Sequence, residues 1–258
     1  MSIDFHSPNL IDRSLVVDTF NFACHDGLPC FTTCCRQLDL PLYPYDILRL
    51  RRALGLTSAQ FLQTHVRLVA SQHPFFPALM LNMAEGEQQF CPFLGPAGCR
   101  VYPDRPSACR SYPLERAVGR RAAGARLDEQ YFLVRHSYCQ GHGQQRTYAL
   151  ALWEREQGLY HYNLENDLWA EMDALFATNP WAGEGKAGPK QRLAFMVCYC
   201  VDEFRDYLQQ NSLLDGFRLS REVRRRITGD DVELLRFGYD WLRYVLVGAG
   251  PLVRKSRS

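Results

Sequence analysis

Four cysteines within a stretch of twelve residues constrain this chain more than any other feature of its sequence. Two of them are adjacent, in the run CHDGLPCFTTCC. This first set consists of Cys24, Cys30, Cys34 and Cys35. A second set consists of Cys91, Cys99, Cys109 and Cys139. Thiolate is the soft, charge-donating ligand that proteins offer to zinc and to iron–sulfur centres. The eight cysteines are therefore predicted to be metal ligands.

A disulfide framework is the formal alternative, because the total of ten cysteines is even. The N-terminal residues contain several charges and no uninterrupted apolar segment of the kind found in signal peptides. No window reaches the roughly 18 apolar residues of a membrane span. We therefore expect a soluble, cytoplasmic protein without membrane partners. A reducing compartment disfavours disulfides, so metal binding is the preferred interpretation of the thiols.

Composition excludes few other classes of protein. With 47% hydrophobic and 22% charged residues, the chain can bury a core like that of an ordinary globular protein. Its 30 basic residues are nearly balanced by 28 acidic ones, so nucleic acid is not an expected partner. The basic run at Arg221 and Arg224–Arg226 is interpreted as a solvated surface.

The pattern of elements predicts a helix-rich α+β protein. An irregular, cysteine-rich metal-binding core with small β elements is expected over residues 1–142. A helical half is expected over residues 143–258, packed on the first part. The two parts could also form one continuous domain. Apolar residues at three- and four-residue spacing predict its helices at 144–157, 164–176, 191–210 and 231–246.

Several elements of the first half can be placed from local signals. Strand material is expected around Leu15–Val17 and around Phe20 and Phe22. One helix is expected to end at Gly55, with Arg49, Arg51 and Arg52 facing solvent. The capping box from Thr57 to Gln60 predicts a second helix that continues to about Val69. A hairpin over 78–90, a short helix over 105–110, and strands at 114–118 and 131–134 complete the prediction.

The cysteine spacings do not specify one metal. They read C-x5-C-x3-C-C and then C-x7-C-x9-C, followed by Cys139 alone. Eight thiols allow two four-ligand sites, or one such site with spare or bridging thiolates. Cys34 and Cys35 could serve two centres, since adjacent side chains in extended backbone point to opposite faces. His25 or His136 could each replace a thiolate. Cys198 and Cys200 lie in an apolar run and are predicted to be core residues.

An iron–sulfur cluster is favoured over zinc, because eight thiols without histidine knuckles suit a cluster better. Three arginines, Arg100, Arg105 and Arg110, stand beside cysteines of the second set. Four thiolates on Zn²⁺ leave a net charge of about −2, which guanidinium groups would offset. The alternative is a purely local turn pair between Asp104 and Arg105.

The order of these motifs resembles a known family. The cysteine cluster precedes LYPYDILRL, and CPFL, CRVYPDRP and CRSYPL then follow in sequence. These segments, over roughly residues 20–142, are similar to the YkgJ-type cysteine-cluster proteins, also described as the CxxCxxCC or zinc- or iron-chelating domain family. The family has the compact spacing C-x2-C-x2-C-C, whereas this chain has the longer spacing C-x5-C-x3-C-C.

The resemblance implies chelation of zinc or of an iron–sulfur centre, with no reaction assigned to most members. Flagellin lysine N-methylases look related through the same cluster. They imply an alternative, in which a metal-dependent enzyme transfers a methyl group from S-adenosylmethionine to a lysine of a protein substrate. No glycine-rich S-adenosylmethionine loop is recognisable in the sequence. A metal sensor or carrier is a further alternative, so the sequence leaves open whether the chain is an enzyme.

Overall fold

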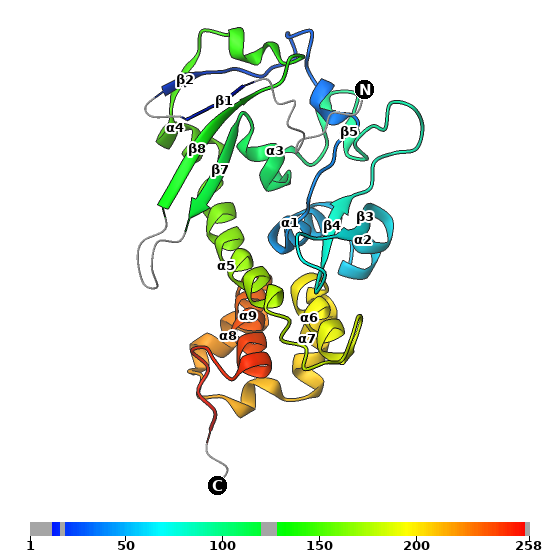
Figure 1. Ribbon diagram of the computed structural model, residues 1–258, viewed down its shortest axis with the longest axis vertical. Helices are drawn as coiled ribbons and strands as arrows, with labels where there is room; N and C mark the ends of the chain where they lie inside the picture. The colour runs from blue at the N-terminus through cyan, green and yellow to red at the C-terminus, as the bar shows by residue number, and fades with distance from the viewer. Residues whose placement is uncertain (1–11, 16–18, 120–127, 256–258) are drawn as a thin grey trace. The chain divides into compact units, whose positions relative to one another are not determined.

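The computed structural model describes residues 12–15, 19–119 and 128–255 (Figure 1). The chain forms two compact units, each built from two stretches. Unit 1 comprises Met1–Pro41 and Met80–Asn163, and unit 2 comprises Leu42–Leu79 and Leu164–Ser258. Helices together with small antiparallel strand pairs confirm the predicted α+β class. The boundary expected at residues 142 and 143 stays a prediction, because compactness does not test independent folding.

Unit 1 contains most of the strands. A three-stranded antiparallel sheet has the order β1-β8-β7, and Figure 1 shows β7 and β8 as two neighbouring green arrows. β2 pairs with β9, and β5 with β6. The elements are β1 (Asp12–Leu15), β2 (Thr19–Asn21), η1 (Thr33–Cys35), β5 (Leu94–Gly95), β6 (Gly98–Cys99), η2 (Tyr102–Asp104), α3 (Ser107–Ser111), β7 (Leu114–Gly119), β8 (Asp128–Arg135), η3 (Gln140–Gly143), β9 (Thr147–Ala149) and α4 (Leu150–Gln157).

Aromatic side chains form the core of unit 1. Phe20 on β2 faces Tyr148 on β9, and Trp153 on α4 packs edge-on against both rings. The Trp153 indole N–H donates to the Ser111 carbonyl at 3.1 Å, which satisfies its polar group within the core. The strands predicted at 114–118 and 131–134 are confirmed as β7 and β8. The predicted strand residues Val16 and Val17 lie outside the described residues.

A close backbone approach at Gly141 joins two distant segments of unit 1. The Ala23 N–H donates to the Gly141 carbonyl at 3.1 Å. A Cβ atom at residue 141 would lie 2.7 Å from the Ala23 carbonyl oxygen and 2.7 Å from Phe22 Cε2. Only glycine leaves room for this contact, so residue 141 fixes how closely the segment after Cys139 approaches the segment before Cys24.

Replacing Gly141 with alanine should therefore destabilise unit 1 by about 1–3 kcal/mol, because the backbone must move to admit the methyl group. Gly143→Ala is the matched control, since a Cβ atom there meets nothing within 4 Å. Urea unfolding followed by circular dichroism would measure both variants. Equal midpoints for Gly141→Ala and Gly143→Ala would contradict the packing described above.

Unit 2 consists mainly of helices. In Figure 1 they run from yellow α6 and α7 to orange and red α8 and α9. α5 (Leu159–Ala177) begins in unit 1 and continues into unit 2. The other elements are α1 (Pro44–Leu54), α2 (Ser58–His65), β3 (Val66–Ala70) and its partner β4 (Pro77–Leu81), α6 (Pro189–Tyr199), α7 (Val201–Gln210), η4 (Leu213–Gly216), α8 (Arg221–Gly229) and α9 (Asp231–Val247).

The two helices predicted after residue 40 are both present. The first ends where it was predicted to end, and the second begins where it was predicted to begin. α1 ends at Gly55, whose φ of 66° is in the left-handed region that favours glycine. α2 begins with the predicted capping box, in which Thr57 Oγ1 accepts from the Gln60 N–H and Gln60 Oε1 accepts from the Thr57 N–H. α2 ends at His65 rather than near Val69, because Val66–Ala70 pairs with β4 as strand β3.

Other elements also differ from their predicted extents, mostly because a segment pairs with a distant part of the chain. The hairpin predicted over 78–90 is wrong, because β4 pairs with β3 and Phe90 bridges to Arg36 instead. The helix predicted from residue 144 begins only at Leu150, since Thr147–Ala149 pairs with β2. The helix predicted over 191–210 breaks at Cys200, which has φ −117° and ψ 66°.

α8 was not predicted, because only Ile227 of its residues is buried and the apolar pattern is weak. Its start is nevertheless marked locally, since the Ser220 side chain accepts from the Val223 N–H. The basic run from Arg221 therefore lies on a helix. The other helical predictions at 164–176 and 231–246 are confirmed within α5 and α9, with α5 starting earlier at Leu159.

Arg51 is buried, contrary to the prediction that it faces solvent. Its guanidinium binds two carboxylates of unit 2: Nη1 lies 3.1 Å from Asp202 Oδ1, and Nη2 pairs with Asp231. Asp202 also accepts from the Ser58 N–H at 2.6 Å, at the start of α2. The network links α1 and α2 to α7 and α9. A buried cation is tolerated here because both partners offset its desolvation.

Arg51→Met should lower the free energy of unfolding by about 3 kcal/mol, because it leaves two carboxylates without their shared cation. The lower end of the range for buried pairs is expected, since the Asp202 side chain is 38% exposed. Arg52→Met is the control, because Arg52 is the exposed neighbour on the same helix. Thermal or urea unfolding of the two variants would test this. A loss of the same size in Arg52→Met would argue against the buried network.

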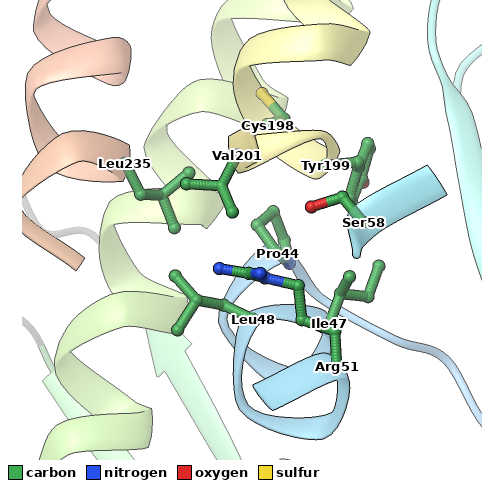
Figure 2. Close-up of a pocket in the computed structure, with 9 residues that line it drawn as sticks. All are labelled: Pro44, Ile47, Leu48, Arg51, Ser58, Cys198, Tyr199, Val201 and Leu235. Carbon is green, nitrogen blue, oxygen red and sulfur yellow. The ribbon is translucent and has the colours of Figure 1, made fainter. Parts of the chain in front are cut away.

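Cys198 belongs to the core of unit 2. It is buried and lines a cavity of about 10 Å³, into which Arg51 and Ser58 also project (Figure 2). That volume is about what one water molecule needs. Cys200 is half-buried at the break between α6 and α7. Among the described residues, no helix has the combined length and hydropathy that a membrane-spanning segment requires.

Candidate metal centre

The first cysteine set lies on a loop made of successive tight turns. Backbone hydrogen bonds run from Leu28 to His25, from Phe31 to Leu28, from Thr33 to Cys30 and from Cys35 to Thr32, at 2.9–3.1 Å. Thr32 adopts φ 63°, which turns the chain sharply before η1. No strand or long helix holds this loop. Because regular backbone hydrogen bonds do not fix the loop, the interactions of its side chains can determine its conformation.

The second set approaches the first through the backbone. The Cys91 N–H donates to the Cys35 carbonyl at 2.8 Å, and the Gln37 N–H donates to the Gln89 carbonyl at 2.9 Å. Cys91 precedes β5, and the β5–β6 hairpin places Cys99 opposite Leu94. Cys109 is carried by the short helix α3, and Cys139 directly precedes η3.

All eight predicted ligands consequently lie in unit 1, whereas Cys198 and Cys200 lie in unit 2. Cys24 and Cys109 are exposed, and the other six are half-buried. This exposure differs from that of a cysteine that serves as a small core residue, such as Cys198.

The thiols are close enough to influence one another electrostatically. Although Cys24 is exposed as a residue, partial burial of its thiol raises the pKa to about 11, and the charges of Cys34, Cys139 and Cys30 add to this effect. Burial likewise raises the pKa of Cys91 to about 11, with Cys99 and Cys34 contributing. Such mutual repulsion between thiolates is what a bound cation would relieve.

Cys34 and Cys35 are directly linked. The Cys35 thiol donates a hydrogen bond to the Cys34 sulfur, which lowers the pKa of Cys34 and raises that of Cys35. Cys34 therefore has the strongest thiolate character of this pair. The charge of Cys34 also acts on Cys91, Cys99 and Cys139.

Backbone N–H groups point at several of the sulfurs. The Gln140 N–H donates to Cys30 Sγ at 3.2 Å. In three further cases the donor lies two or three residues after the cysteine: Phe93 and Leu94 to Cys91, Val101 to Cys99, and Gly141 to Cys139. Hydrogen bonds of this kind favour the charged thiolate over the thiol. They also tune the affinity and potential of metal centres bound by thiolates.

A layer of aromatic and histidine side chains lies against the cluster. The Tyr112 hydroxyl donates to the Cys139 sulfur and lies 3.3 Å from His142 Nε2. Tyr138 is influenced by the charges of Cys34 and Cys139 and stacks on His136 at 5.1 Å. Sequence reasoning missed Tyr138 and His142. Their position next to Cys139 in the sequence was the signal that could have identified them.

The two histidines proposed as replacement ligands have different surroundings. His25 Nδ1 accepts from the Gly27 N–H at 3.2 Å, in the exposed part of the loop. His136 is buried between Tyr112 and Tyr138, and burial lowers its pKa. A neutral imidazole is the form that binds metals, so His136 has the required protonation state. Neither histidine is assigned as a ligand.

The arginines of the second set have separate roles. Arg105 and Arg100 both lower the pKa of Cys99, which burial raises, so their charges favour its thiolate. Arg105 is also influenced by the charges of Cys109 and Cys99. Arg110 instead stacks over Tyr162 at 4.5 Å and donates to the Pro103 and Gln157 carbonyls. Arg100 and Arg105 offset thiolate charge, whereas Arg110 fixes the local fold.

The donor set fits zinc or iron in its chemistry, because soft thiols, oriented N–H groups and nearby cations occur together. Among the described residues, no three His, Cys, Asp or Glu side chains already converge on a point where an ion could be held. Thiols such as Cys34 and Cys35 hydrogen-bond to each other instead.

Residues 23–140 match the model of the CxxCxxCC family, whose description is "Putative zinc- or iron-chelating domain". The similarity covers this segment and not the whole chain. The match includes all eight cysteines of unit 1 and excludes Cys198 and Cys200. It confirms the family resemblance found in the sequence and supports zinc or iron chelation. No curated protein and no solved structure matches the chain.

Tyr112→Phe should weaken metal binding by about 10–100-fold, because it removes the hydroxyl that donates to the Cys139 sulfur while keeping the ring. Tyr160→Phe is the control, since Tyr160 is 71% exposed on α5 within unit 1. Competition with a chelator, followed by metal analysis, would measure the two affinities. An unchanged affinity in Tyr112→Phe would mean that this hydroxyl does not act on the centre.

Proposed function

We propose that residues 23–140 bind iron or zinc through thiolates supplied by the eight cysteines of unit 1, and that an iron–sulfur centre is the favoured form. The observation that carries the proposal is the concentration of eight partly exposed cysteines in one unit, with backbone N–H groups directed at several of their sulfurs. The family match supports the same class of metal.

Two features favour an iron–sulfur centre over zinc. Every proposed ligand is a cysteine, which is the usual ligand set of [2Fe–2S] and [4Fe–4S] clusters. Hydrogen bonds to the sulfurs are among the factors that set the reduction potential of such clusters. Zinc in an all-cysteine tetrahedral site is the second form. When bound, an iron–sulfur cluster would supply electron transfer, whereas zinc would stabilise the fold.

The sequence-based alternatives are a protein lysine N-methyltransferase that uses S-adenosylmethionine, and a metal sensor or carrier. The cavity in Figure 2 lies within unit 2, and none of the eight cysteines lines it. No specific observation favours either alternative, so metal binding is the function proposed.

The experiment that tests the proposal is metal analysis of the full chain purified without oxygen. Iron, zinc and sulfide would be measured per chain, together with the visible absorption spectrum. Iron with matching sulfide and charge-transfer absorption would identify a cluster, whereas zinc is colourless because its d shell is full. Protein that neither retains nor takes up iron or zinc would refute the proposal.

Cys34→Ser and Cys109→Ser should each lower the metal content and destabilise the fold, because serine is a poor ligand for a soft metal. Cys198→Ser should leave the metal content unchanged, since Cys198 is buried in unit 2. Elemental analysis of the three purified variants would measure this. Unaltered stoichiometry in both Cys34→Ser and Cys109→Ser would contradict the ligand assignment.

A further inference from the structure

The eight thiols fall into two groups that are held together by different parts of the backbone. In the first group, the Ala23 N–H donates to the Gly141 carbonyl at 3.1 Å, which brings Cys24 toward Cys139. The Gln140 N–H donates to Cys30 Sγ at 3.2 Å, which brings Cys30 to the same place. The charges of Cys139 and Cys30 both act on Cys24, as expected for three neighbouring thiols.

The second group is assembled around Cys91. The Cys91 N–H donates to the Cys35 carbonyl at 2.8 Å, and the Leu94 N–H donates to the Cys91 carbonyl at 3.0 Å. Leu94 pairs with Cys99 across the β5–β6 hairpin, so Cys91 and Cys99 are neighbours.

Cys109 joins this second group from helix α3. Its charge acts on Cys35, and the charges of Cys109 and Cys99 act on the same guanidinium of Arg105. That guanidinium is held in place by the Tyr102 carbonyl, to which Nη1 donates at 2.6 Å, and by the side chain of Gln157. Cys35, Cys91, Cys99 and Cys109 therefore lie on segments that meet in one part of unit 1, which also contains the buried Arg105.

Cys34 interacts electrostatically with cysteines of both groups. Its charge acts on Cys24 and Cys139 of the first group and on Cys91 and Cys99 of the second. The second group already has four thiols, which is the number that a tetrahedral ion or a cysteine-ligated cluster takes. The first group has three without Cys34, so Cys34 completes it.

We propose that the eight cysteines form two adjacent metal centres, one bound by Cys24, Cys30, Cys34 and Cys139, and the other by Cys35, Cys91, Cys99 and Cys109. The proposal rests on the function proposed above and specifies how its ligands are divided. The adjacent residues Cys34 and Cys35 supply one ligand to each centre. Because these two residues are consecutive in the chain, the two centres would be neighbours.

Single and double variants of the full chain test this division through its metal content. Cys30→Ser and Cys91→Ser should each lower the metal per chain roughly twofold, because each removes one ligand of one centre. Cys30→Ser combined with Cys139→Ser should lose no more than Cys30→Ser alone. Cys30→Ser combined with Cys91→Ser should lose nearly all of the metal. Cys198→Ser is the control.

Equal metal content in the two double variants would overturn the division, as would complete loss in a single variant that keeps the wild-type circular dichroism spectrum. A single variant can also lose metal because it unfolds, so the unmodified chain is tested separately. The metal-free protein would be titrated with Co²⁺ without oxygen, monitored by visible absorption.

Saturation at two Co²⁺ per chain is expected, because each tetrahedral centre takes one ion. Saturation at one Co²⁺ would overturn the two-centre proposal while leaving metal binding intact. No binding of Co²⁺, together with no iron or zinc in the purified protein, would refute the proposed function itself. The failure of the division and the failure of metal binding are therefore distinguishable.

Discussion

The hydrogen bond from the Cys91 N–H to the Cys35 carbonyl, 2.8 Å long, is the contact on which the cysteine cluster of unit 1 depends most. It joins two cysteine sets that are far apart in sequence. A second backbone contact, from Ala23 to Gly141, closes the other side of the cluster. Closing loops of this length costs conformational entropy. Each contact must therefore be supported by other interactions, and the aromatic core around Phe20, Tyr148 and Trp153 provides them within the same unit.

The surroundings of the thiols have two opposing effects on their pKa values. Burial raises the pKa of Cys24, Cys91, Cys99 and Cys139, and neighbouring thiolates raise it further. Backbone N–H groups, the Tyr112 hydroxyl and the arginines favour the charged form. By comparison, burial raises the pKa of the core thiol Cys198 well above its usual value. The donors become useful when a cation binds, because they then stabilise the thiolates that the cation requires.

Local signals in the sequence predicted the elements that depend on local physics. The capping box at Thr57 and Gln60, the end of α1 at Gly55 and the strands β7 and β8 were all found, as was the family of residues 23–140. The predictions are wrong where contacts with distant segments override the local pattern. Val66–Ala70 continues a helical pattern but pairs with β4, and Arg51 is buried because Asp202 and Asp231 approach it from other helices. No local pattern of residues contains that information.

The same distinction applies to the metal centre. The eight cysteines could be proposed as ligands from their chemistry alone, whereas their grouping depends on which backbone segments meet. Cys34 and Cys35 are adjacent in sequence: the Cys35 carbonyl accepts a backbone hydrogen bond from Cys91, whereas the charge of Cys34 raises the pKa of both Cys139 and Cys91. The loop from Cys24 to Cys35 is held by tight turns rather than by a sheet. A metal that binds such a loop contributes free energy to folding, because it orders side chains that the backbone alone leaves in other positions.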